Sequence, residues 1–295
     1  MLYMVEVGDT LSTIANRFGT TISAILAANV ICNPDYIFVG MPLIIPNSNI
    51  SLPKAGGLPY YVIMTGDSLW CLSQQFTTSP ETLMKANQIT NPDLLVPGAE
   101  LLIKAYIVDP VALYNSWNIK EEDCSHINSI WGQQVFYNGQ FQWESLGEQA
   151  VPYLKHLLNH PCNIVRDSAV LSLGRIGRGE AARLALQQAV DNDPDENIVG
   201  NARIALKRLD LVTKSSKRIH ITTSQTQLFS APSFELQYIE LRPATPIIVN
   251  RWYVPSPLGE TSGPGALAVF DLVQVVATGQ TGFVPRAGDA AITFL

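Results

Sequence analysis

Hydrophobic residues near the start of the chain recur at the spacing of a short helix. Four of them lie at i, i+3, i+4 and i+7, namely Leu11, Ile14, Ala15 and Phe18. Thr10 is suited to the N-cap of this helix and Gly19 to its end. A second helical face follows at 22–26, and Asn29 suits a left-handed position after it. With short apolar runs at 3–7 and 43–45, the pattern predicts the order strand, helix, helix, strand.

The same pattern returns further along the chain at a constant offset of 58 residues. Gly8-Asp9-Thr10-Leu11 matches Gly66-Asp67-Ser68-Leu69, and Asn33-Pro34-Asp35-Tyr36-Ile37 matches Asn91-Pro92-Asp93-Leu94-Leu95. Phe18, Asn29 and Gly40 meet Phe76, Asn87 and Gly98 at the same offset. The chain therefore begins with an internal duplication without insertions, and its second copy should have the same fold.

Apolar positions at helical spacing predominate in the middle of the chain. They predict helices at 151–158, 165–176, 181–189 and 198–209. Paired helices with small residues where neighbours meet favour an α-solenoid. Residues 106–148 are rich in aromatic side chains without a clear period, and we expect mixed helix and loop there.

Near Ser216 the chain changes to β-branched runs interrupted by proline and glycine. These runs predict five short strands, at 219–223, 234–241, 247–254, 268–277 and 282–285. The C-terminal region is therefore expected to be a small all-β domain.

Composition and charge exclude some classes of function and of binding partner. The 295 residues are 47% hydrophobic, which allows several buried cores, and the net charge is −6. No region is basic enough to neutralise phosphates, so nucleic acid and anionic membranes are not expected partners. We find no apolar span of membrane length. The first residues also lack a signal peptide, and we expect a protein that does not use classical export.

The four cysteines, Cys32, Cys71, Cys124 and Cys162, are scattered singly along the chain. In the duplication Cys32 matches Thr90, and Cys71 matches Thr13. The copies therefore share no cysteine position, and we expect free buried thiols.

The duplicated stretches resemble the LysM module. They carry the pattern Y-x-V-x-x-G-D-[TS]-L-x-x-[IL]-[AS]-x-x-F, then A-N, then N-P-D-x-[IL]-x-x-G-x-x-L-x-I, over roughly residues 3–46 and 60–104. LysM modules bind glycans that contain N-acetylglucosamine, namely peptidoglycan or chitin. The resemblance implies a shallow groove between the loop before the first helix and the loop after the second.

These two loops supply the backbone groups, short polar side chains and apolar surface that a neutral sugar chain requires. The predicted ligand-binding residues are Gly8, Asp9, Thr10, Leu11, Pro34, Asp35, Tyr36 and Ile37 in the first copy, and Gly66, Asp67, Ser68, Leu69, Trp70, Pro92, Asp93, Leu94 and Leu95 in the second. Tyr36 and Trp70 stand at non-equivalent places, which predicts unequal binding by the two copies.

Some of these residues also have a structural interpretation. A role as helix caps would by itself account for Asp9, Thr10 and their counterparts Asp67 and Ser68. A role in forming turns would by itself account for Asn33 and Asn91. The two roles are compatible. Two tethered modules that reach one glycan can gain about 10²–10⁴ in avidity.

Two weaker resemblances concern the remainder of the chain. Val151-Pro152-Tyr153-Leu154 and the run 165–174 resemble HEAT-type repeats, which imply a protein-docking surface; the alternative is a compact helical spacer. Thr278-Gly279-Gln280-Thr281-Gly282-Phe283-Val284 resembles the closing turn of bacterial SH3-like barrels. A groove there, lined by Trp252 and Tyr253, would bind wall peptide, but core or rim is the alternative role of these residues.

No catalytic constellation is recognisable in the sequence. Cys124 and His126 are the nearest thiol and imidazole pair but lack a family signature. His156, His160 and Cys162 have metal-ligand types at the end of a predicted helix, but we favour no metal site and no cofactor.

The sequence therefore predicts an α+β multidomain protein: LysM modules at 1–48 and 59–105, an α-helical HEAT-like domain at 106–212 and an SH3-like barrel at 216–295. The predicted function is a non-catalytic adaptor on peptidoglycan or chitin, with a possible protein partner. It would lie at a bacterial cell envelope or spore surface, and otherwise in the cytoplasm. The alternative is a cell-wall hydrolase with its catalytic group in residues 106–160.

Overall fold

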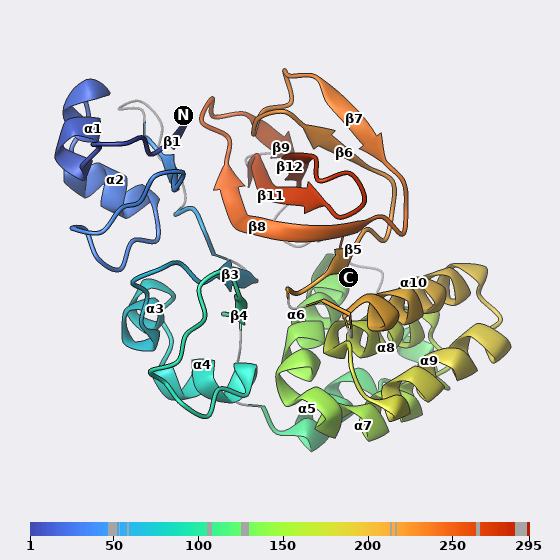
Figure 1. Cartoon of the computed structure of the whole chain (residues 1–295). Coiled ribbons are helices and arrows are strands. Elements are labelled where there is room, and N and C mark those ends of the chain that lie inside the picture. The colour runs from blue at the N-terminus through green and yellow to red at the C-terminus, as the bar shows by residue number, and fades with distance from the viewer. Residues whose placement is uncertain are drawn as a thin grey trace.

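The computed structural model describes residues 1–46, 52, 54–57, 59–104, 108–124, 130–212, 214–215, 217–263, 266–286 and 294–295, without the side chains of 130–134. Two small modules lie one above the other at the left of Figure 1, a β domain lies at the upper right and a helical domain at the lower right.

The first module has the predicted order. β1 (Leu2–Met4) pairs antiparallel with β2 (Pro42–Ile44), and α1 (Leu11–Arg17) and α2 (Ile22–Ala28) lie between them in sequence. Thr10 and Thr21 cap the helices by accepting hydrogen bonds from the amides of Thr13 and Ala24. The apolar face predicted from the sequence, with Leu11 and Ile14, forms its core.

The second module repeats this arrangement. β3 (Tyr60–Val62) pairs with β4 (Glu100–Leu102), and α3 (Leu69–Gln75) and α4 (Pro80–Asn87) carry the N-caps Ser68 and Ser79. The duplication thus predicted both folds from local signals.

The role predicted for Asn29 is wrong, because its backbone is extended at φ −133°. Its buried side chain instead donates to the carbonyls of Ile25 (2.9 Å) and Ile44 (2.8 Å) and accepts from the amide of Ile44 (2.8 Å). Asn87 makes the equivalent three bonds in the second module. This asparagine therefore ties the second helix to the closing strand.

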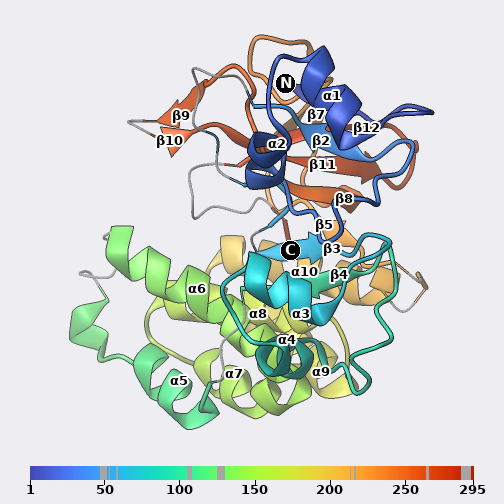
Figure 2. The same cartoon turned by 90° about the vertical axis from the view of Figure 1, so that its left-hand side faces the viewer.

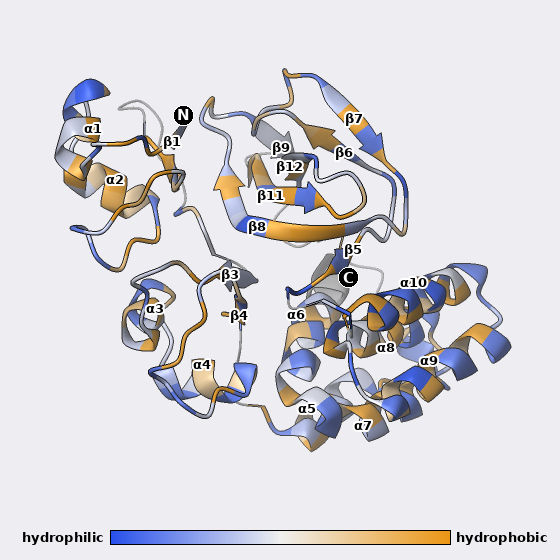
Figure 3. Cartoon of the chain, viewed as in Figure 1, coloured by the Kyte–Doolittle hydropathy of each residue, from blue (hydrophilic) through white to orange (hydrophobic). Residues whose placement is uncertain are grey.

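The helical domain contains the four predicted helices: α7 (Val151–Leu157), α8 (Asn163–Ile176), α9 (Glu180–Asn192) and α10 (Glu196–Val212). It also has α5 (Pro110–Trp117), α6 (Ile130–Leu146) and the short 3-10 turns η1 (Glu121–Asp123) and η2 (Gly147–Ala150). In Figure 3, α9 and α10 alternate between hydrophobic and hydrophilic segments, as amphipathic helices do. No helix in the described ranges is long and apolar enough to cross a membrane.

α6 lies in the segment without a readable period, and its environment explains why. Phe136 and Trp143 pack into the core of the helical domain, whereas Phe141 packs against Tyr60 of module 2 and the β domain. A helix buried on more than one side lacks a polar face, so its sequence shows no amphipathic pattern. Figure 2 shows α6 and α4 on the same side of the molecule.

The β domain is a six-stranded antiparallel sheet in the order β5-β8-β11-β12-β6-β7. Its strands are β5 (His220–Ile221), β6 (Thr226–Phe229), β7 (Tyr238–Leu241), β8 (Pro246–Pro255), β11 (Val269–Val275) and β12 (Thr281–Pro285), and β9 (Thr261–Gly263) pairs separately with β10 (Ala266–Leu267). Within the described residues β7 does not pair with β5, so the sheet is open and the predicted barrel is not confirmed. β6 and the β9–β10 hairpin were not predicted.

β8 holds both modules against the β domain. Arg251 donates to the carbonyl of Pro42 and to Oδ1 of Asn29 (3.0 Å) in module 1. The next residue, Trp252, donates from Nε1 to Glu100 of module 2 (3.2 Å). Successive residues of one strand therefore fix two different modules.

The expectation of free thiols is wrong, because all four cysteines form two disulfides. Cys32 bonds to Cys71, with Cα atoms 5.7 Å apart, and Cys124 bonds to Cys162 at 5.5 Å. The comparison of equivalent positions missed the first bond because it joins non-equivalent positions, one after α2 of module 1 and one in α3 of module 2.

Candidate glycan-binding site

The first predicted loop of module 1 is fixed by a carboxylate and a cap. Oδ2 of Asp9 accepts hydrogen bonds from the hydroxyl of Tyr3 and from the amide of Glu6 (2.9 Å). Thr10, and not Asp9, is the helix N-cap. Gly8 permits the turn because its φ is +86°. Asp67 repeats the bonds of Asp9 in module 2, from Tyr61 and Met64.

The second predicted loop of each module is an asparagine turn, as predicted. Oδ1 of Asn33 accepts from the amide of Asp35, and Oδ1 of Asn91 from the amide of Asp93, both at 3.0 Å. These turns leave Pro34 and Asp35, and equally Pro92 and Asp93, exposed to solvent.

The large apolar side chains of the site fall into two groups. Tyr36 is 46% exposed, Trp70 69% and Leu94 70%, so all three can contact a ligand. Leu11 and Leu69 are buried in the module cores, which leaves their loops only backbone groups to offer at these positions.

The equivalent carboxylates Asp9 and Asp67 have pKa values displaced in opposite directions. Hydrogen bonds from Tyr3 and the Glu6 amide, with Arg17 beside them (2.9 Å), lower the pKa of Asp9 below its ordinary value. Burial raises the pKa of Asp67, because desolvation outweighs its hydrogen bonds. Module 2 has Gln75 where module 1 has the Arg17 guanidinium.

The two predicted grooves adjoin one another, which the sequence did not reveal. A Cβ added to Gly66 would lie 3.4 Å from Cδ1 of Tyr36, so the ring of module 1 lies against the first loop of module 2. The Cys32–Cys71 disulfide also joins the two modules covalently, which restrains this contact. The structure therefore brings together Tyr36 and the loop that precedes Trp70.

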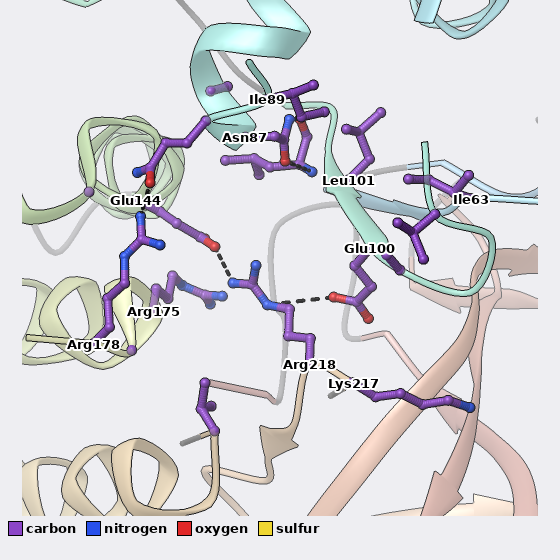
Figure 4. Close-up of a pocket in the computed structure, with 18 of the residues that line it drawn as sticks. Ile63, Asn87, Ile89, Glu100, Leu101, Glu144, Arg175, Arg178, Lys217 and Arg218 are labelled. Carbon is purple, nitrogen blue, oxygen red and sulfur yellow. Dashed lines mark hydrogen bonds and ion pairs between the residues drawn. The ribbon is translucent and has the colours of Figure 1, made fainter. Parts of the chain in front are cut away.

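Module 2 also borders a cavity of about 460 Å³ that sequence analysis missed (Figure 4). Its loop contributes Leu94, Leu95 and Val96, and the helical domain contributes Arg175 and Arg178. The cavity is built from segments far apart in sequence, so no local pattern could have indicated it.

One wall of this cavity is a buried polar network around Tyr60. Figure 4 shows the guanidinium of Arg218 between the carboxylates of Glu144 and Glu100. The hydroxyl of Tyr60 donates to Glu144 and accepts from Arg218 (3.2 Å) and Arg175 (3.4 Å). Burial alone would raise the pKa of Glu144, but the two guanidiniums lower it below its ordinary value.

The structure bears on each candidate for catalysis or metal binding. Cys124 is disulfide-bonded, so the thiolate proposed for it is contradicted. His126 lies outside the described residues. The ring of His156 packs edge-on against Tyr114, and both ring nitrogens of His160 are engaged, by the amide of Cys162 and the carbonyl of Ile119. These histidines therefore have structural partners.

Comparisons with known families agree with the two modules and the helical repeats. The LysM domain family matches residues 3–46 and 61–104, and the HEAT repeat family matches 142–207. The chain thus carries tandem LysM domains followed by a HEAT-like repeat region.

Known relatives match about a third to two fifths of the chain. The secreted LysM effector ECP6 of Passalora fulva is 34% identical over 137 residues, which is 41% of this chain and 60% of that protein. The N-acetylmuramoyl-L-alanine amidase sle1 of Staphylococcus aureus is 32% identical over 111 residues, 34% of this chain and 33% of that protein. The chain therefore spans less than two thirds of either relative.

Among solved structures, the spore cortex-lytic enzyme SleL of Bacillus megaterium QM B1551 is similar at 14% identity over 96% of this chain and 88% of that one. The SleL of Bacillus cereus matches at 13% identity over 97% and 88%. TM-scores of 0.18 and 0.19 are too low to assign a shared fold.

Proposed function

We propose that this chain is a non-catalytic carbohydrate-binding adaptor that recognises N-acetylglucosamine-containing glycans, peptidoglycan or chitin, through its two LysM domains. The contact of Tyr36 with Gly66 carries the proposal, because it makes one continuous surface from two loops. On this surface exposed aromatic rings and turn backbone groups lie side by side, and a neutral sugar chain uses both. The predicted loop residues, from Gly8 to Ile37 and from Gly66 to Leu95, are its ligand-binding set.

The fixed geometry of the modules supports binding to one glycan. Flexible modules lose orientational freedom when both engage a ligand, whereas a disulfide-linked pair has already lost it. The pair should therefore bind a long glycan more tightly than either module binds alone.

The disulfides also support the proposed location. Disulfides form and persist in oxidising compartments and are rare where glutathione keeps thiols reduced. A chain with all four cysteines paired fits a bacterial cell envelope or spore surface.

A protein partner is a further part of this proposal. The HEAT-like helices carry an outward face, on which Leu184 of α9 is 61% exposed. Solenoid repeats use such faces to dock proteins. The β domain is the second candidate for a binding surface, and its ligand would be the peptide part of the wall.

Co-sedimentation of the full chain with insoluble peptidoglycan and chitin tests the glycan proposal. Tyr36→Ala and Trp70→Ala should each weaken binding about tenfold, since a lost aromatic contact is worth about 1.5 kcal/mol. Tyr238→Ala is the matched control on chitin, which carries no peptide, because this ring is 49% exposed on β7, in a different domain. A wild-type chain that stays in the supernatant with both polymers would contradict the proposal.

The hydrolase alternative needs its own experiment. Labelled peptidoglycan is incubated with the chain, and soluble fragments are measured over time. We expect no release above buffer. Release that is lost in His156→Ala would replace the adaptor interpretation with the hydrolase, and Asn159→Ala, also exposed near the end of α7, is the matched control.

A further inference from the structure

The cavity beside module 2 continues into a second one. The first, of about 460 Å³, and the second, of about 450 Å³, share Gln88 and Arg178 as lining residues. We call the two together the interdomain cleft. One side is α4 and the loop 94–96 of module 2, and the other is formed by α6, η2 and α8.

The first cavity is cationic in a chain that is acidic as a whole. Its lining has five cations, Arg175, Arg178, Arg208, Lys217 and Arg218, and two carboxylates, Glu100 and Glu144. This is an excess of three positive charges in a chain with a net charge of −6. A low-dielectric wall with one sign of charge concentrates ions of the opposite sign.

The two carboxylates are already engaged. Both pair with Arg218, and Glu100 also accepts from Nε2 of His220 (2.8 Å). Together with Arg218 they carry one net negative charge, so they offset only one of the other four cations of the cavity.

The bonds of two buried guanidiniums are to neutral groups. Arg208 donates to the carbonyls of Ile219 (2.9 Å) and Gly174 (2.5 Å). Burial, with Arg218 nearby, lowers the pKa of Arg208 to about 10, which still leaves it charged at neutral pH. Arg175 donates to Oε1 of Gln140 (3.0 Å) and to the carbonyl of Phe294 (3.2 Å). Neither guanidinium forms a salt bridge within the described residues, and Glu144 alone does not balance both charges. An anion in the cleft would offset part of the cost of burying them.

We infer that the interdomain cleft receives carboxylate groups of an acidic glycan held by module 2, so that the chain prefers peptidoglycan to chitin. The inference rests on the proposed glycan-binding function. Leu94 and Leu95 belong to the predicted glycan loop and also line the cleft, so a glycan on module 2 passes its mouth. Peptidoglycan carries carboxylates on its stem peptides, and on its lactyl groups where the peptide has been removed, whereas chitin is neutral.

Calorimetric titration of the full chain with two soluble glycans of equal sugar number tests the inference. One is a chitin oligomer and the other a peptidoglycan fragment free of phosphate polymers. Arg178→Ala with Lys217→Ala removes two exposed cations from the cleft. This double variant should bind the peptidoglycan fragment about threefold to tenfold more weakly at low salt and bind chitin unchanged. Amidation of the fragment's carboxylates should have the same effect on the wild type.

The control is Lys155→Ala with Arg203→Ala, which removes two exposed cations outside the cleft lining and should leave both affinities unchanged. Equal wild-type affinity for the acidic, amidated and neutral glycans overturns the inference and leaves the glycan-binding proposal standing. An equal loss of affinity for all three glycans in the double variant of Arg178 and Lys217 also overturns the inference and leaves the glycan-binding proposal standing. A wild type that binds none of them contradicts the glycan-binding proposal itself.

Discussion

The two LysM modules dock through the same face but into different surroundings. Leu2, Ala28 and Ile44 of module 1 pack into a cluster with residues of the β domain. At the offset of 58 residues, their counterparts are Tyr60, Ala86 and Leu102, which enter a cluster shared with α6 and the β domain. Module 1 is therefore attached by apolar contacts and by the hydrogen bonds of Arg251, whereas module 2 brings a hydroxyl into a buried ionic network.

This difference shows how a duplicated fold acquires two roles. The docking residues lie on the strands and the second helix of each copy and not in the predicted sugar loops, so either copy can be anchored without using them. Module 2 forms the cleft with the helical domain, and module 1 contributes Tyr36, which contacts the first loop of module 2.

The largest expected difference between the two modules is in the stability lost when the equivalent side chain of each docking face is removed. Tyr60→Ala should lower the free energy of unfolding by about 4 kcal/mol, because a buried aromatic ring is lost and a buried ion network loses its hydroxyl. Leu2→Ala at the equivalent, partly exposed position should lower it by about 1–2 kcal/mol. Urea unfolding measures both, and equal losses would show that the modules are anchored alike.

The disulfide between the modules should have the next largest effect. Cys32→Ser with Cys71→Ser should lower the free energy of unfolding by about 3 kcal/mol, since this bond closes a loop of 39 residues. The variant should also bind a long glycan more weakly than the wild type while its affinity for a short one is unchanged. Cys124→Ser with Cys162→Ser, which removes a bond of separation 38, is the control for glycan affinity.

The asparagine that ties helix to strand offers a matched pair of variants. Asn29→Ala should cost about 2 kcal/mol, because it leaves buried backbone groups of Ile44 without a partner and removes one of the two acceptors of the Arg251 guanidinium. Asn87→Ala should cost about 1 kcal/mol, because this position is half-buried. The reverse order in thermal or urea unfolding would contradict the assigned burial of the two positions.

The smallest effect concerns pH and His220 of β5, which contacts Glu100 of module 2. Burial lowers the pKa of His220 below its ordinary value of 6.5, despite Glu100 beside it, and Arg218 also disfavours its protonation. As the pH falls, the unfolded state therefore binds a proton at a higher pH than the folded state does. The contribution of neutral His220 to the free energy of unfolding is complete above pH 6.5 and is lost as the pH falls below it. Between pH 6.5 and 5.5 we expect a loss of about 1 kcal/mol that is absent in His220→Asn. A wild-type stability that is flat over this range would contradict it.

The fold was predictable wherever its determinants are local. Threonine and serine caps, glycine turns and apolar spacing specified both modules, and apolar spacing specified helices α7 to α10. The open sheet, α6 and the disulfide pairs depend on contacts between distant segments. Local patterns therefore indicated five of the six strands of the sheet, without β6 and without the strand order.

The candidate site was predictable only loop by loop. The turns at Asn33 and Asn91 are recognisable from the sequence, but the contact of Tyr36 with Gly66 depends on how one module is placed on the other. The network of Tyr60, Glu144 and Arg218 joins residues separated by 84 and 74 positions, beyond any periodicity.

The consecutive residues Arg251 and Trp252 have a mechanical consequence. They hold module 1 and module 2 from neighbouring points of β8, a strand hydrogen-bonded to β11 along most of its length. The same two modules are also joined covalently by the Cys32–Cys71 disulfide. A force that pulls the two glycan loops apart is thus shared by this bond and by the side chains anchored on β8. A stretched polymer mesh would load the disulfide and the strand together.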